Sequence, residues 1–229
     1  MPILSNMNIL LIILMLILFI SQSDEQQLKN DDMCNLTREI LCVKDVLKDI
    51  VTMIENINQT INKIQKYILS KIIKVNKFDH YITHEIDLIN SYLPISKYHV
   101  NFFQMNNIHK KYLINLFLEA HNAMSFYHNS INDILNMNDT SSLIIDNWFN
   151  QIQYNLRYEI ICQYRNILNI YSHEWTLINQ INRIKFSTIK YQSSPSIVHD
   201  VHSIINIQLL QKWIQKIHSV INNLETKFF

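Results

Sequence analysis

The sequence contains no glycine at all, whereas average usage of about 7% would place roughly fifteen in a chain of 229 residues. Glycine supplies the positive φ angles and the close backbone approach that tight hairpins, phosphate-binding loops and nucleophile elbows need. A P-loop, a Rossmann turn and most β-rich architectures are therefore disfavoured.

An excess of charge of either sign is also missing. Lys and Arg number 20 against 19 Asp and Glu, which gives a formal net charge of +1. Proteins that bind nucleic acid or an anionic membrane surface normally carry a basic excess. We therefore predict no nucleic-acid partner, and the length of 229 residues favours a single domain.

The N-terminal segment has the pattern of a secretory signal peptide. An apolar run at residues 9–20 is too short to span a bilayer comfortably, and Ser21-Gln22-Ser23 and the polar stretch DEQQLKNDD follow it. The residues before the run include no Lys or Arg, so the free amino terminus supplies the positive charge, and an uncleaved anchor is the alternative. We expect a signal peptide at residues 1–23 and a mature domain at residues 24–229 that is secreted, extracellular and not inserted in a membrane.

Secretion would place the three cysteines, Cys34, Cys42 and Cys162, in an oxidising compartment where a disulfide is expected. Within one helix Cys34 and Cys42 would lie roughly 12 Å apart, which is too far for a disulfide. We predict that one of these two pairs with Cys162, while the remaining cysteine is free or pairs between chains. Secretion also makes Asn35, Asn58 and Asn138, which begin Asn-X-Thr sequons, candidate glycosylation sites; Asn138 beside a predicted loop is the strongest.

Apolar residues recur at alternating steps of four and three from residue 43 onward, which is the heptad pattern of one long helix. We predict a helix of about 35 residues that starts at Val43. A dimeric coiled coil would show the same pattern, but later periodic segments favour a bundle formed within the chain. The positions of this seam are Val43, Leu47, Ile50, Ile54, Ile57, Ile61, Ile64 and Ile68.

Three more segments carry the helical period: residues 104–135, a third that starts near residue 142, and a fourth that runs from Ser196 almost to the C-terminus. A short helix at residues 79–92 precedes a break at Pro94, and the serine-rich linker FSTIKYQSSPS surrounds Pro195. The connections are thus long, short and long, and parallel neighbouring helices need such long crossovers. We predict an all-α, long-chain four-helix bundle, up-up-down-down with two long crossover connections.

No group of residues predicts catalysis or a metal site. His80 and His84 in DHYITHE are four residues apart, but the zinc-protease motif places a Glu inside the pair, whereas here Glu85 follows the second His. We interpret these histidines as surface or loop-packing residues. No Ser/His/Asp set and no paired carboxylates have a recognisable spacing, so we expect neither enzyme activity nor a cofactor.

The fourth segment reads HDVHSIINIQLLQKWIQKIHSVINNLE. Trp213 continues its apolar seam, so we predict that this side chain is buried. We interpret His199, His202 and His218 as neutral imidazoles on the surface of the bundle, with a pH-sensitive partner surface as the alternative. The face opposite the seam is weakly charged and rich in Gln, Asn and His, so we expect it to be available to a partner.

The segment QLLQKWIQKIHSVI at residues 208–221 resembles the last helix of leukaemia inhibitory factor, and LQKWIQKIHSVINNL resembles the corresponding helix of ciliary neurotrophic factor. Cysteines near the first helix and in the third are similar to the arrangement in leukaemia inhibitory factor and oncostatin M. The chain therefore resembles the long-chain helical cytokines of the interleukin-6 group. The lack of glycine and the abundance of Asn and Ile equally resemble a divergent invertebrate ligand of the Unpaired type.

This resemblance implies a secreted, monomeric ligand that binds cell-surface cytokine receptor ectodomains and activates JAK/STAT-type signalling. The family presents a Phe and a Lys three residues apart at the start of its fourth helix, whereas Phe186 and Lys190 are four apart here and precede the linker. We take these two residues, with Gln211, Gln215 and His218, as candidate receptor contacts. The alternatives are a secreted helical carrier of a lipid or small apolar ligand and a secreted effector that blocks a host protein.

Overall fold

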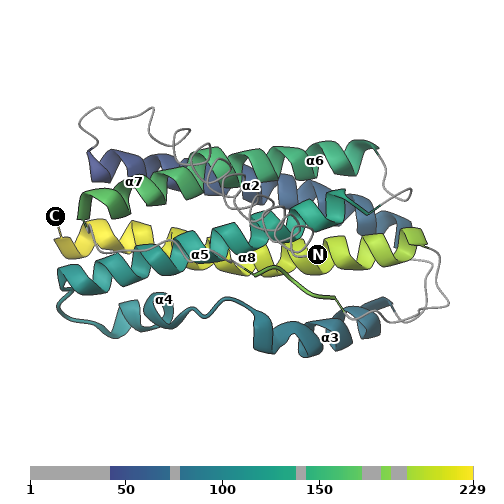
Figure 1. Cartoon of the computed structure of the whole chain (residues 1–229), viewed down its shortest axis with the longest axis horizontal. Helices are drawn as coiled ribbons and strands as arrows, with labels where there is room; N and C mark the ends of the chain where they lie inside the picture. Colours follow the sequence, from purple (N-terminus) through teal and green to yellow (C-terminus); the bar gives the residue numbers. More distant parts are fainter. Residues whose placement is uncertain (1–41, 73–77, 138–142, 172–181, 187–194, 229) are drawn as a thin grey trace, which may run out of the picture. The chain divides into compact units, whose positions relative to one another are not determined.

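The computed structural model describes residues 42–72, 78–137, 143–171, 182–186 and 195–228, and no strand occurs among them (Figure 1). The prediction of an all-α fold is confirmed. Residues Cys42–Phe229 form one compact unit. The expected signal peptide at residues 1–23 lies outside the described residues and stays a prediction. None of the described helices combines the length and the apolar character of a membrane span.

Four long helical segments form the body of this unit (Figure 1). Each begins close to the predicted position except α5, which starts six residues after residue 104 because a 3-10 turn and an irregular stretch precede it. The third segment is continuous but changes to a π-helical turn in its middle. The segments are α2 (Val43–Ile72), α5 (Lys110–Leu135), α6 (Leu143–Tyr154) with η3 (Asn155–Ile161) and α7 (Cys162–Tyr171), and α8 (Pro195–Phe228).

Residue pairs between the helices fix two of their relative directions. Along α2, Glu55 lies near His218 of α8 and Gln65 donates to Gln211, so the two helices run antiparallel. Along α5, Phe117 packs near Tyr164 and Asn132 accepts from Gln153, so α5 runs antiparallel to the α6–α7 segment. Contacts of α2 with α8, α8 with α5, α5 with α6–α7, and α6–α7 with α2 close a ring around one core.

The predicted seam of α2 forms one side of this core. Its isoleucines from residue 50 onward are at most 3% exposed, whereas Val43 and Leu47 are half-buried because α2 begins there. Trp213 of α8 is 3% exposed, so the prediction that it is buried is confirmed. A heptad seam packs in this way because positions three and four apart lie on one face of a helix. The fully buried isoleucines of α2 are Ile50, Ile54, Ile57, Ile61, Ile64 and Ile68.

The connection between α2 and α5 covers part of the bundle. It contains α3 (Phe78–Ile89), η1 (Asn90–Tyr92), α4 (Lys97–Asn101) and η2 (Phe102–Gln104). The predicted short helix at residues 79–92 is confirmed as α3 with η1, and the chain leaves the helical conformation around Pro94 as expected. Both α3 and α4 contact α8, and α4 also contacts α5.

The packing of the connection against α8 corrects one interpretation from the sequence. His199 and His202 were expected on the surface, but they are 0% and 8% exposed. Residues 201–207 are all buried, which means that this part of α8 is covered on every side. The periodicity of α8 predicts one buried face, and α2 and α5 occupy it; α3 covers a further face. After residue 207, α8 leaves a polar face at the surface, around Lys212, Gln215 and Ser219.

Candidate partner-binding surface

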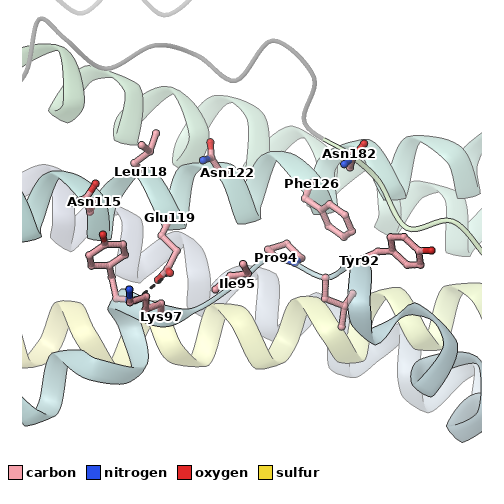
Figure 2. Close-up of a pocket in the computed structure, with 12 residues that line it drawn as sticks. Tyr92, Pro94, Ile95, Lys97, Asn115, Leu118, Glu119, Asn122, Phe126 and Asn182 are labelled. Carbon is pink, nitrogen blue, oxygen red and sulfur yellow. Dashed lines mark hydrogen bonds between the residues drawn. The ribbon is translucent and has the colours of Figure 1, made fainter.

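A groove of about 600 Å³ lies between the α2–α5 connection and α5 (Figure 2). One wall is the stretch from Tyr92 to Tyr98, which runs past Pro94 between η1 and α4, and the other wall is the outer side of α5. Asn182, from the described segment 182–186, closes one end (Figure 2). The lining residues are Tyr92, Leu93, Pro94, Ile95, Lys97, Tyr98, Asn115, Leu118, Glu119, Asn122, Phe126 and Asn182.

Large apolar side chains are exposed along the same connection. Some of its apolar residues, such as Ile89 and Phe102, are buried against the bundle, and these anchor the connection. Others point outward and are between 48% and 77% exposed. Single exposed apolar residues are common, but several along one connection are typical of an interaction surface, and two of these, Tyr92 and Ile95, line the groove. The exposed residues, which we call the connection patch, are Leu88, Tyr92, Ile95, Val100 and Phe103.

A carboxylate of α5 holds the connection in place. Glu119 accepts hydrogen bonds from the backbone N–H groups of Tyr98 (3.1 Å) and His99 (3.0 Å), at the start of α4. Its Oε2 also lies 2.7 Å from Nδ1 of His99, and the two side chains are 10% and 2% exposed. Hydrogen bonds to a carboxylate are stronger than those between neutral groups, and water competes little at this burial. Glu119 therefore fixes the position of α4 against α5.

A second contact holds the connection on α8. Nζ of Lys216 donates to Oγ of Ser96 over 2.9 Å and lies 5.2 Å from the ring of Trp213. The ring of His99 meets the same indole edge to face at 5.3 Å. Burial lowers the pKa of Lys216, and the nearby Glu119 carboxylate opposes this effect. Because it is tied to both α5 and α8, the connection loses little conformational entropy when a partner binds beside it.

Three of the candidate receptor contacts lie together, along the border between α8 and α2. Nε2 of Gln211 donates to Oδ1 of Asn58 over 2.8 Å, so this side chain is engaged within the protein. His218 Nε2 lies 3.5 Å from a carboxylate oxygen of Glu55. Gln215 is exposed, and it lines a small surface hollow of about 160 Å³ with His218.

The other two candidates are not part of this group. Phe186 is half-buried, and its ring stacks on the ring of His202 at 3.8 Å and 7°. His202 precedes Gln211 by nine residues of α8, which is roughly 14 Å along the helix axis. Phe186 therefore makes an internal contact at a distance from the other candidates. Lys190 lies outside the described residues.

Of the three candidate glycosylation sites, the structure describes Asn58. Asn58 is half-buried, and the sequon's Thr60 is 3% exposed, with its hydroxyl donating to the carbonyl of Asn56. Asn35 and Asn138 lie outside the described residues.

The cysteines also differ. Cys42 is exposed and free, whereas Cys162 is half-buried at the start of α7. Cys34 lies outside the described residues, so the pairing with Cys162 stays a prediction.

The two histidines of α3, His80 and His84, were interpreted from the sequence as surface or loop-packing residues. His84 is exposed, and nothing is described of the side chain of His80. In the described ranges no three His, Cys, Asp or Glu residues are placed so that they could hold a metal ion.

The connection patch was not among the predictions from sequence. The sequence feature that could have indicated this patch is the apolar stretch Tyr92-Leu93-Pro94-Ile95, which has no helical or alternating period and surrounds a proline. Apolar residues in such a stretch cannot be assigned to a core by periodicity. Their exposure depends on how the connection lies across α5 and α8, which only the tertiary structure decides.

No family model matches this chain, and neither a curated protein nor a solved structure matches it.

Proposed function

We propose that this protein is a secreted helical ligand that binds cell-surface receptor ectodomains, with the groove and the connection patch as its main contact surface. The observation that carries the proposal is the rigid presentation of exposed apolar side chains beside a groove. Protein interfaces draw most of their affinity from a few large side chains, aromatic ones above all, in well-packed surroundings. The resemblance to helical cytokines adds receptors of the JAK/STAT pathway as the specific partner class.

The same proposal includes the up-up-down-down topology. Antiparallel pairing of α2 with α8, and of α5 with α6–α7, agrees with it. The connections at residues 73–109 and 172–194 are long, whereas that at 136–142 is short, as two crossovers and one tight loop require. The colours of Figure 1 also progress in the same direction along α2 and α5.

A carrier of a small apolar molecule is the second candidate, because the groove has the volume of a small-molecule site. One observation favours the ligand over the carrier. The groove is open along the surface rather than enclosed between the helices (Figure 2). A carrier usually buries most of the surface of its cargo.

The test combines binding with signalling. Purified protein is applied to cells of the source organism, STAT phosphorylation is measured, and binding to the recombinant cytokine-receptor ectodomains of that organism is measured in parallel. The patch variant carries Tyr92→Asp and Ile95→Asp, which place charges on two exposed side chains without touching the core. The matched control carries Leu143→Asp and Ile170→Asp, which change apolar residues on α6 and α7 that are also more than half exposed.

We expect the unmodified protein and the control to bind and to signal, and the patch variant to lose affinity at least tenfold, which corresponds to the loss of about 1.4 kcal/mol. Silence of the unmodified protein across all these receptors would remove the signalling proposal. Equal affinity of the patch variant and the control would show that the partner binds elsewhere. Co-purification of a stoichiometric apolar molecule would favour the carrier.

A further inference from the structure

A stripe of buried polar side chains runs along the first half of α8. His199, His202, Ser203 and Asn206 are three, one and three residues apart, so they lie along one side of the helix. Three of them are 0% exposed and His202 is 8% exposed. Buried positions on a bundle helix are normally apolar, so this stripe departs from the rest of the core.

The polar atoms of the stripe have few partners. Both ring nitrogens of His199, Nε2 of His202, Oγ of Ser203 and both amide atoms of Asn206 are buried and make no hydrogen bond. Oδ1 of Asp200 lies 3.9 Å from Nδ1 of His199, which is too long for a hydrogen bond. Buried polar groups that give up hydrogen bonds to water without replacing them weaken the contact that buries them.

The α3 helix and the segment 182–186 lie against this part of the molecule. The α3 helix contacts α8, and its Glu85 is 0% exposed and acts electrostatically on His202. From the segment 182–186, the ring of Phe186 stacks on the ring of His202. The neighbouring α3 residues Thr83 and His84 are exposed, which places Glu85 on the side of α3 that is buried.

The charges around His202 are few. Glu85 of α3 and His199 of α8 are the groups that act on it. In the segment 182–186, Arg183 is engaged with Asp133 of α5 at 2.9 Å.

The other charged contacts of α8 are distant from His202. Glu55 of α2 approaches α8 at His218, and Glu119 of α5 acts on Lys216. Both positions on α8 are at least fourteen residues beyond His202, roughly 21 Å along the helix.

Burial is the largest effect on the pKa of His202, which it lowers from 6.5 to about 4; the Glu85 carboxylate raises the pKa and His199 lowers it. The folded protein therefore holds this imidazole neutral at pH 7 and resists its protonation below pH 6.5. If α3 moves away, water can solvate the imidazolium, so protons bind more readily to the open form. Acid then favours opening.

We propose that the contact between α3 and α8 is an acid-sensitive latch, in which protonation of the buried His202 releases α3 while the four long helical segments stay folded. Protonation would place a charge on a ring whose Nε2 is buried without a hydrogen-bond partner, and Glu85 is the carboxylate that acts on it. The η1 turn links α3 to the wall of the groove at Tyr92, so the opening would also alter the groove. This inference concerns the chain itself and does not depend on the proposed function.

The test is hydrogen exchange of the full chain at pH 7.4 and pH 5.0, followed peptide by peptide and corrected for the pH dependence of intrinsic exchange. From the pKa of about 4 for His202 in the folded protein and 6.5 in the open form, opening should increase about 25-fold between the two pH values. We expect the protection of α3 amides to fall by about this factor at pH 5.0, and that of α6 amides to fall much less.

The variant His202→Gln should show a much smaller pH effect on α3 than the unmodified protein. His109→Gln is the matched control, because His109 is exposed at the start of α5, and its pH effect should equal that of the unmodified protein. The unmodified protein is sufficient to overturn the latch. It would do so if the protection of α3 amides were unchanged at pH 5.0, or if α3 and α6 amides lost protection equally. A full pH effect in His202→Gln would overturn the role of His202.

Discussion

The folded protein should lose stability in mild acid because it buries a neutral histidine between α5 and α7. His121 is 1% exposed, and burial, the largest effect, lowers its pKa from 6.5 to about 4. A hydrogen bond with Asn122 raises this pKa, and the charge of Arg165 lowers it. The unfolded chain therefore binds a proton between about pH 6.5 and pH 4, where the folded protein does not.

The size of the effect follows from these two pKa values. Stability that depends on neutral His121 is fully present above about pH 7 and is lost as the pH falls through that window. Between pH 7 and pH 5 the loss is about 2 kcal/mol, and at still lower pH it approaches about 3 kcal/mol. Domains of this kind are stable by about 5–15 kcal/mol, so one histidine controls a measurable share of the total.

The variant His121→Leu should separate this effect from the others. Leucine fills a similar volume without a titratable group, so the variant should lose about 2 kcal/mol less than the unmodified protein between pH 7 and pH 5. The free energy of unfolding is measured by urea titration at each pH, with an unchanged slope as the sign that the folded state is the same. His109→Leu, at an exposed position, is the control and should retain the full pH dependence.

An identical loss of stability in His121→Leu and in the unmodified protein would refute the reasoning, because the buried imidazole would then not be the group that takes up the proton. A loss in the control variant as small as in His121→Leu would refute it as well, since the effect would then not depend on burial.

Three further predictions concern the connection and the covalent modifications. Glu119→Gln should lower the free energy of unfolding by about 2 kcal/mol in urea titration, because α4 loses a charged hydrogen-bond acceptor, and an unchanged midpoint would contradict this. Asn58 should carry no glycan in intact-mass measurements, because it is half-buried and Thr60 of its sequon is only 3% exposed. In the non-reduced protein, Cys42 should react with iodoacetamide, and peptide mapping should recover Cys34 joined to Cys162; a peptide that joins Cys42 instead would contradict the pairing.

The helices themselves could be predicted from the sequence. Their starts at Val43, near residue 142 and near Ser196 came from apolar spacing, as did the burial of Trp213, because the period of a helix decides which side chains share a face. The absence of glycine favoured long helices over turns and sheets, and no strand occurs in the described ranges. These properties are local, so neighbouring residues are sufficient to determine them.

What lies outside the bundle helices was decided only by tertiary structure. His199 and His202 were assigned to the surface, yet α3 covers them, because a long connection can lie on any face of a helix and periodicity does not say which. Likewise, Tyr92 and Ile95 are exposed because Glu119, which belongs to a different helix, anchors the connection. Such contacts join residues far apart in the chain, so the sequence alone determined the helices of this protein, and their packing decided its surfaces.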